Sequence, residues 1–292
     1  MDPITKETNG MKSIVQETSS PLQTEEQFLA SYRIEQYDRP SVATDVTVFS
    51  MFAKESDCHR KDSEPELSIL LVKRGEHPFF NQWALPGGFL RADETVEACA
   101  IRETKEETNL SPVAMLPVGV FSEPNRDPRG RIISHAFAAI ISEKEVKISG
   151  GSDTKDAKWF SVSFEESSDG CYTLTLSQEE ATLTAELKES QNTFGKKTFE
   201  IITNNGLAFD HAKIIATALT ELRKKADNSD LAFDFLPETF TLAALQKVQE
   251  TLLGISLLTA NFRRKVTPLL EETEEYTEGA GHRPARLFRR KQ

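Results

Sequence analysis

Short apolar runs separated by polar segments make the first half of the chain rich in predicted strands. The runs are dense in β-branched and apolar side chains and too short for buried helices. Pro117 lies inside one of them and cannot donate a ladder hydrogen bond, so that strand is predicted at a sheet edge. The polar residues 54–66 predict a loop. The predicted strands are Val42–Phe52, Leu67–Val72, Val113–Phe121, Ile132–Ile141 and Ala157–Phe160.

Two stretches of the same region carry helical spacing. Acids crowd the start of the first, so Asp93 is predicted to cap a helix running to about Asn109. The second, residues 210–225, repeats its apolar side chains every three or four positions and ends in lysines. Strands combined with one long helix predict an α/β or α+β sandwich.

The chain divides into three predicted parts. Residues 1–27 are polar without an apolar period and predict a mostly disordered arm. Residues 28–226 form one domain, in which residues 165–204 are poorly patterned and predict a polar insertion. A linker at Asp227–Asp230 opens a second unit, residues 227–292.

The second unit has the pattern of two short helices followed by a hairpin. Leu242–Leu253 predicts a helix that ends at Gly254, and a second helix runs from a cap at Thr259 to a stop at Pro268. Residues 270–290 predict a hairpin with its turn near residues 278–281. Two helices and a basic hairpin fit a winged helix-turn-helix. A small dimerisation module with a solvated basic edge is the alternative.

Composition narrows the class of protein. Hydrophobic residues make up 38% of the chain and charged residues 28%, which is compatible with a packed core. The apolar runs are too short to span a bilayer, and no signal peptide is visible. Cys58, Cys99 and Cys171 form no metal or redox spacing, so we expect reduced thiols in a cytoplasmic protein.

Charge is distributed unevenly. The net charge is −11, which argues against a general nucleic-acid coat. Residues 259–292 carry +3, so the rest of the chain carries −14. A basic end on an acidic body predicts a local anionic partner.

The segment from Gly88 to Leu110 carries the sharpest chemical signal. At about 100° per residue, Glu106 and Glu107 project within roughly 60° of Glu103, while Ile101, Thr104 and Thr108 lie on the opposite, buried side. Three like charges repel, and a hard divalent cation would offset that repulsion. An acidic run of this kind is also commonly a solvated helix face, but the ordered spacing from Gly88 through Glu94 to Arg102 favours a site.

This segment resembles the Nudix box. It matches the pattern at Gly88, Glu94, Arg102, Glu103, Glu106, Glu107 and Leu110, after a Trp-Ala-Leu-Pro-Gly stretch typical of the family. Thr104 and Asn109 depart from the aliphatic residue and the glycine of the pattern. We expect the Thr104 hydroxyl to bond the carbonyl four residues back, and Asn109 to adopt the left-handed helix end.

The resemblance implies a Nudix α/β/α sandwich and hydrolysis of a nucleoside diphosphate linked to another group. Glu103, Glu106 and Glu107 would bind Mg²⁺ or Mn²⁺, Arg102 would hold a glutamate in place, and Glu94 would support the turn before the helix. The catalytic residues are thus expected among Arg102, Glu103, Glu106 and Glu107, with Gly88 and Glu94 structural.

The loop from Ser122 to Arg131 resembles that of the ADP-ribose-directed branch. Arg126, Arg129 and Arg131 would contact phosphate or ribose, or else form an exposed charged turn. Three aromatic residues, Phe79, Phe80 and Trp83, would either stack a base or pack the core, and packing is favoured.

The second unit supplies candidate DNA contacts. Arginine and lysine suit phosphates and guanine edges, and asparagine suits adenine. Together with the segments NFRRKV and GHRPARLFR, the order of domains resembles the Nudix-related transcriptional regulators of NAD metabolism. The candidate DNA-binding residues are Asn261, Arg263, Arg264, Lys265, Arg283 and Arg286.

Two functions follow from these resemblances. The first is a Mg²⁺-dependent Nudix hydrolase of ADP-ribose or a similar nucleotide-sugar compound, carrying a DNA-binding winged helix. The alternative is an ADP-ribose-responsive regulator of NAD or sugar metabolism with little or no hydrolysis. Either is expected to be a homodimer on operator DNA with no membrane partner.

Overall fold

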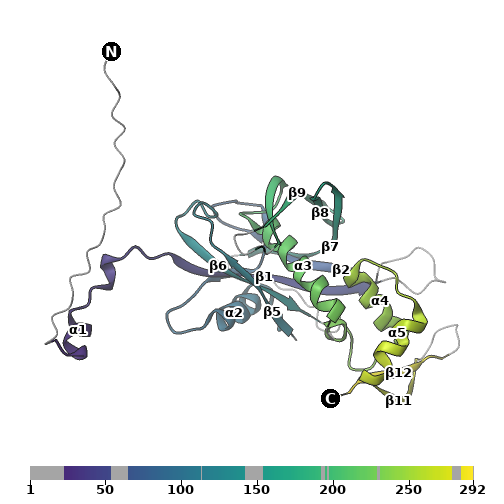
Figure 1. Cartoon of the computed structure of the whole chain (residues 1–292). Coiled ribbons are helices and arrows are strands. Elements are labelled where there is room, and N and C mark those ends of the chain that lie inside the picture. Colours follow the sequence, from purple (N-terminus) through teal and green to yellow (C-terminus); the bar gives the residue numbers. More distant parts are fainter. Residues whose placement is uncertain are drawn as a thin grey trace. The chain divides into compact units, whose positions relative to one another are not determined.

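The computed structural model describes residues 23–53, 65–112, 114–141, 154–191, 195, 197–228, 231–277 and 284–291 (Figure 1). The chain divides into two compact units, residues 1–39 and residues 40–292. In the first unit, helix α1 (Glu25–Ser31) begins inside the predicted arm because Thr24 and Gln27 form a capping box, and the 3-10 helix η1 (Ile34–Gln36) follows. Residues 1–22 of the arm lie outside the described part.

The larger compact unit, residues 40–292, is built on a mixed sheet of ten strands. Its spatial order is β10-β9-β8-β7-β2-β1-β6-β5, with β3 paired to β2 and β4 paired to β1. Only the pair of β1 and β6 is parallel among these. The strands are β1 (Ser41–Ala53), β2 (Pro65–Arg74), β3 (Trp83–Ala84), β4 (Gly87–Phe89), β5 (Ala114–Phe121), β6 (Ile132–Ile140), β7 (Thr154–Ser168), β8 (Cys171–Gln178), β9 (Ala181–Gln191) and β10 (Lys197–Asn205).

Helices cover both faces of the sheet, as the sandwich prediction requires. Alternating side chains of β1 make this possible, since Val46 and Val48 face helix α2 (Val96–Thr108) while Phe49 and Met51 face helix α3 (His211–Asn228). The predicted edge position of the strand containing Pro117 is confirmed: β5 ends the sheet, and its register with β6 shifts after that proline.

The prediction of an unpatterned polar insertion over residues 165–204 is wrong. This stretch completes β7 and forms β8, β9 and β10, which extend the sheet. The core side of β8 and β9 alternates Leu174 and Leu176, then Leu183 and Leu187, with threonine and glutamate between. The period of two was present, but the polar partners concealed it.

Helix α2 corrects the prediction at two points. Thr95, not Asp93, is its N-cap and accepts a hydrogen bond from the Ala98 N–H, because residues 91–94 form a separate turn held by Glu94. Ile101 was expected on the buried side but is exposed, since Ala100 and Thr104 form the buried stripe. The capping prediction at the other end is confirmed: Asn109 has the left-handed conformation (φ 56°).

The C-terminal elements have the winged-helix arrangement expected from the sequence. Helix α4 (Leu242–Leu253) ends at left-handed Gly254, as predicted. The cap position of helix α5 (Thr259–Val266) is Leu258 rather than the predicted Thr259, and it makes no side-chain cap bond. The turn at residues 278–281 lies outside the described part. The elements are η3 (Leu231–Phe235), α4 (Leu242–Leu253), α5 (Thr259–Val266), η4 (Thr267–Leu269), β11 (Leu270–Tyr276) and β12 (Arg286–Arg290).

The predicted linker at Asp227–Asp230 is wrong at its start, since Asp227 belongs to α3. The hydrophobic core continues from Leu222 of α3 through Leu231 to Leu245 of α4. The domain boundary near residue 227 therefore stays a prediction. Of the described helices, none combines the length and apolar character needed to cross a membrane.

Candidate functional site

Arg102 organises the acidic face of α2. Its guanidinium donates two hydrogen bonds to the Glu94 carboxylate, at 2.9 and 2.6 Å. It also donates to Glu103 at 2.5 Å and to Glu106 at 3.1 Å. The bonds to Glu94 hold the pKa of Arg102 above its ordinary value and lower the pKa of Glu94 to about 2. Arg102 thus orients the carboxylates around it, as the box resemblance implied.

The two glycines of the turn let backbone and carboxylates approach closely. A Cβ at Gly88 would lie 2.5 Å from the Glu103 carboxylate, and one at Gly87 would lie 2.1 Å from the Thr44 carbonyl oxygen. The Gly87 N–H donates to Glu107 Oε2 at 2.9 Å. Glycine at position 88 therefore leaves room for the Glu103 carboxylate beside the backbone, and the Gly87 backbone binds the Glu107 carboxylate.

Glu107 titrates near neutrality. Burial, reinforced by the charges of Glu103 and Asp45, raises its pKa to about 7. A folded-state pKa above the unfolded value stabilises the fold while the group is protonated. That contribution is complete below about pH 4 and is lost as the pH rises through 7.

We expect Glu107→Gln to stabilise the metal-free protein at pH 8, by roughly 2–3 kcal/mol. The amide oxygen can still accept from Gly87, while the buried charge is gone. Urea unfolding in chelator at pH 8 and pH 4 measures the effect. The gain should vanish at pH 4, and the half-exposed Glu106→Gln should show none at either pH. A variant less stable than the parent at pH 8 would contradict this electrostatic account.

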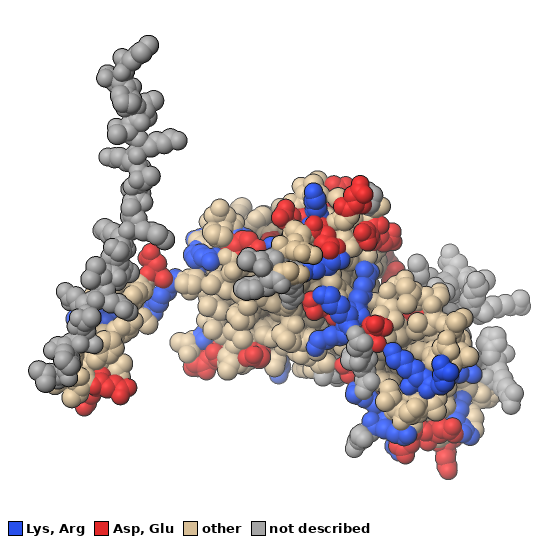
Figure 2. Space-filling view, viewed as in Figure 1, with Lys and Arg blue, Asp and Glu red and all other residues tan. Residues whose placement is uncertain are grey.

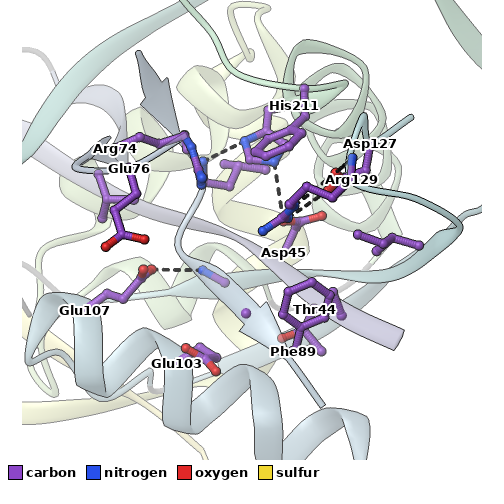
Figure 3. Close-up of a pocket in the computed structure, with 18 of the residues that line it drawn as sticks. Thr44, Asp45, Arg74, Glu76, Phe89, Glu103, Glu107, Asp127, Arg129 and His211 are labelled. Atoms are coloured by element: carbon purple, nitrogen blue, oxygen red, sulfur yellow. Dashed lines mark hydrogen bonds and ion pairs between the residues drawn. The ribbon is translucent and has the colours of Figure 1, made fainter. Parts of the chain in front are cut away.

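Glu103 and Glu107 face a cavity of about 320 Å³ between α2, the sheet and the start of α3 (Figure 3). Across it lie two guanidinium groups, those of Arg74 and Arg129. Arg129 stacks near the rings of Phe89 (5.1 Å) and Phe209 (5.5 Å), and Arg74 lies 4.9 Å from the Phe209 ring. Burial and the charge of Arg129 lower the pKa of Arg74. This wall favours an anion with a planar group.

A buried ionic cluster forms the inner wall of the cavity. Arg126, 5% exposed, donates to both oxygens of Asp210 (2.9 and 2.7 Å) and to Asp45 (3.1 Å). His211 Nδ1 accepts the Leu85 N–H at 2.9 Å, so a proton on the neutral ring lies on Nε2, which is 3.4 Å from Asp45. Burial would raise the pKa of Asp45, but His211 and Arg126 hold it below its ordinary value.

The three arginines predicted to contact substrate have different environments. Arg129 lines the cavity, with its guanidinium held by Asp127 at 2.7 and 3.0 Å. Arg126 also lines it, but its Nε and Nη2 donate to the two aspartates. Arg131 is exposed, donates to the Ser122 carbonyl at 2.6 Å, and is not a lining residue.

Aromatic packing was predicted correctly for Trp83, which is 6% exposed and packs edge-on against Phe160. Sequence reasoning missed most of the lining residues, because they come from strands or turns without a motif. His211 did carry a signal, since it stands at the start of the predicted helix, where its side chain could face a neighbouring loop. The missed residues that contribute to the walls described above are Asp45, Arg74, Phe89, Asp127, Phe209 and His211.

The carboxylates suit a hard cation, and the predicted set of three ligands stays a prediction. Glu103 and Glu107 line the cavity, whereas Glu106 is half-exposed and lies beside Arg91 and Arg102. In the described ranges, no group of three His, Cys, Asp or Glu side chains is arranged to hold a metal ion. Mg²⁺ commonly takes one or two carboxylates and completes its shell with phosphate oxygens and water. Glu103 and Glu107 supply carboxylate oxygens of this kind to the cavity. Because burial raises the pKa of Glu107, a bound cation would offset the cost of keeping that carboxylate charged.

The predicted DNA contacts lie on the second helix and the wing. Phe262 and Val266 bury the inner side of α5, which leaves Asn261, Arg263 and Arg264 exposed. Lys265 is exposed as well, but its ammonium donates to the Asp227 carbonyl at 3.1 Å. Arg286 on β12 pairs with Glu272 and donates to the Tyr276 hydroxyl, and Arg283 lies outside the described residues. Figure 2 shows basic side chains on the C-terminal winged-helix elements beside a group of acidic ones.

Comparisons with known proteins agree with both parts of this arrangement. Residues 58–167 match the NUDIX domain, and residues 232–290 match the NrtR DNA-binding winged helix domain. The chain is 30% identical over 270 residues to the ADPR responsive transcriptional repressor NtrR of Acinetobacter baylyi, covering 91% of this chain and 88% of that protein.

Two further similarities cover different shares of the chain. The ADP-ribose pyrophosphatase of Methanocaldococcus jannaschii is 40% identical over 134 residues, which are 46% of this chain and 68% of that enzyme. The structure of Shewanella oneidensis NrtR complexed with a 27mer DNA is similar at a TM-score of 0.60 and 27% identity, covering 86% of this chain and 93% of that one.

Proposed function

Because the chain belongs to the family that joins a Nudix domain to an NrtR-type DNA-binding winged helix, we propose that it is an ADP-ribose-responsive regulator. Its cavity binds ADP-ribose, its winged helix binds operator DNA, and ligand binding changes the affinity for DNA. The observation that supports this proposal most strongly is the cavity wall. Arg74 and Arg129 both lie near the Phe209 ring, across the cavity from the carboxylates of Glu103 and Glu107.

The chemistry of the wall matches the parts of ADP-ribose. A diphosphate needs cations, and Arg74 is a guanidinium whose lowered pKa reflects burial and a like charge beside it. A purine needs a flat apolar surface, and the rings of Phe89 and Phe209 both lie close to the Arg129 guanidinium. A volume of about 320 Å³ lies within the range of small-molecule sites.

The names of two relatives support the same assignment. The Acinetobacter protein is described as an ADP-ribose-responsive repressor, and the Shewanella protein was crystallised on DNA. Operator half-sites are commonly bound by two copies of one chain, so we extend the proposal to a homodimer.

Isothermal titration calorimetry tests the ligand. ADP-ribose should bind the full-length protein, in chelator to prevent turnover, more tightly than AMP or ribose 5-phosphate, because each half contacts only part of the wall. Inorganic phosphate serves as the control for nonspecific anion binding. Equal affinity for ADP-ribose and phosphate would contradict the assignment.

Hydrolysis of the same ligand is the second candidate function, and the cavity-facing pair Glu103 and Glu107 favours it. These two carboxylates would hold a divalent cation, which supplies charge neutralisation at the diphosphate and a more acidic water. Arg102 keeps Glu103 oriented, Gly87 positions Glu107, and Arg74 offsets the charge that develops on the leaving phosphate.

For this second function we expect AMP release from ADP-ribose and Mg²⁺ that falls about 100-fold or more in Glu103→Gln. Chromatography of the nucleotides measures it, and Glu186→Gln, an exposed carboxylate on β9, should leave the rate unchanged. If the parent protein binds ADP-ribose but releases no AMP, hydrolysis is dropped and the regulator stands alone.

A further inference from the structure

Helix α3 begins at the cavity and ends at the winged helix. Its first residue, His211, lines the cavity, and its last described turn contacts α4 and α5. Eighteen residues in α-helical geometry span about 27 Å. A single rigid element therefore connects the proposed ligand site with the proposed DNA-binding surface (Figure 1).

The cavity end of α3 is bonded to the groups that would sense a ligand. His211 accepts the Leu85 N–H, two residues before the Gly87 N–H that donates to Glu107. Asp210, immediately before the helix, accepts two hydrogen bonds from Arg126, one on each carboxylate oxygen. Arg126 lies on the same loop as Arg129, the arginine that lies close to both phenylalanine rings. A displacement of this loop or turn would therefore act on the start of α3.

The far end of α3 is bonded to the DNA-binding unit through backbone carbonyls. The last four carbonyls of a helix lack partners inside it, and those of Ala226 and Asp227 are among them in α3. Gln249 of α4 donates to the Ala226 carbonyl, and Lys265 of α5 donates to the Asp227 carbonyl at 3.1 Å. A lysine ammonium also suits the negative end of a helix dipole.

The side of α3 between its ends is packed, so a movement at one end is not absorbed along the way. Leu219 and Leu222 are buried and belong to the same hydrophobic cluster as Leu252 of α4. Arg223 donates to the Phe164 carbonyl of β7 at 2.9 Å. The helix therefore contacts the sheet and α4 along one continuous core.

We propose that α3 transmits the state of the cavity to α5, and that Lys265 and Gln249 are the positioning residues that join it to the winged helix. Lys265 then sets the orientation of α5 rather than acting chiefly as a phosphate contact. This inference rests on the proposed binding of ADP-ribose. It adds the physical connection through which that ligand would reach the DNA-binding surface.

Hydrogen exchange followed by mass spectrometry tests the connection on the full-length chain with ADP-ribose in chelator. Peptides over residues 83–90 and 205–212 report the cavity, and a peptide over residues 258–267 reports α5. In the parent protein, ADP-ribose should protect the cavity peptides and change exchange in α5 by about twofold or more. In Lys265→Met, cavity protection should persist while the α5 response is lost.

The matched control is Lys291→Met. Lys291 also donates to a backbone carbonyl of the winged helix, that of Pro268 at 2.9 Å, but that carbonyl lies outside α3. The Lys291→Met variant should therefore retain the full α5 response to ADP-ribose. Gln249→Met tests the second bond and should weaken the response, with ADP-ribose affinity and melting temperature near those of the parent protein.

The outcomes separate the two proposals. An α5 response that survives in Lys265→Met and Gln249→Met overturns the connection. Cavity protection without any α5 response in the parent protein also overturns it, while leaving ligand binding intact. Absence of cavity protection with ADP-ribose overturns the ligand assignment, and the connection with it.

Discussion

Arg126→Met should lower the free energy of unfolding by about 3–5 kcal/mol, among the largest effects of any single substitution in this chain. The guanidinium is 5% exposed and is held by Asp45 and Asp210, whose side chains are only 13% and 14% exposed. Removing it leaves two buried carboxylates without their cation. Breaking such a pair costs more than the pair itself contributes, because the remaining charge stays buried.

The measurement is guanidinium unfolding at pH 7 with Arg131→Met as the matched control. Arg131 lies on the same loop but is exposed, so its loss should change stability by less than about 0.5 kcal/mol. The difference between the two variants should shrink as the pH falls. The fold holds the pKa of Asp45 below its ordinary value, so the charged Asp45 carboxylate contributes stability that is lost once the pH is low enough to protonate it in the folded protein. A loss below about 1 kcal/mol for Arg126→Met would contradict the structural role of the cluster.

Arg263→Glu/Arg264→Glu should weaken binding to operator DNA by about 100-fold or more. Each arginine is exposed on α5, and each lost contact is worth ~1–3 kcal/mol before the added repulsion. Fluorescence anisotropy with a duplex from upstream of the protein's own gene measures the affinity. The slope of affinity against salt concentration should also fall, because fewer phosphate counterions are released.

The control for that experiment carries the same change of charge elsewhere. Arg131→Glu/Lys188→Glu places two reversals on exposed positions of the loop after β5 and of β9. It should retain most of the affinity. Unchanged binding in Arg263→Glu/Arg264→Glu would favour the alternative stated from the sequence, a dimerisation module with a solvated basic edge.

The acidic segment was the most predictable part of the site because its chemistry is local in sequence. Residues on one helix reach each other through known spacing. The resemblance implied that Arg102 holds one glutamate in place, and the structure pairs it with both Glu103 and Glu106. The same reasoning predicted that Thr104 would bond the carbonyl four residues back, and its hydroxyl donates to Ala100 at 2.7 Å. Position along a helix decides such contacts before tertiary structure does.

The opposite wall of the cavity could not be read from the sequence in the same way. Asp45, Arg126 and His211 come from a strand, a loop and a distant helix, and only the sheet topology brings them together. The predicted metal ligands show the same difference between local spacing and tertiary structure. Helical spacing groups Glu106 with Glu103 and Glu107, while the fold pairs its half-exposed side chain with Arg91 and Arg102.

The missed strands have a different cause. Residues 165–204 alternate leucines with threonines and glutamates, and such strands resemble polar loops when judged by composition alone. Their outer side faces solvent, so only every second residue needs to be apolar. A count of alternation, rather than of apolar content, would have found β8 and β9.

We infer that ADP-ribose in the cavity controls DNA binding by the winged helix. It is tested most directly by titrating ADP-ribose into the complex of full-length protein with the duplex from upstream of its own gene, in chelator, and following anisotropy. Saturating ADP-ribose should change DNA affinity by about fivefold or more, and this change should be lost in Lys265→Met but kept in Lys291→Met. An affinity for that duplex that is the same with and without ADP-ribose would contradict it.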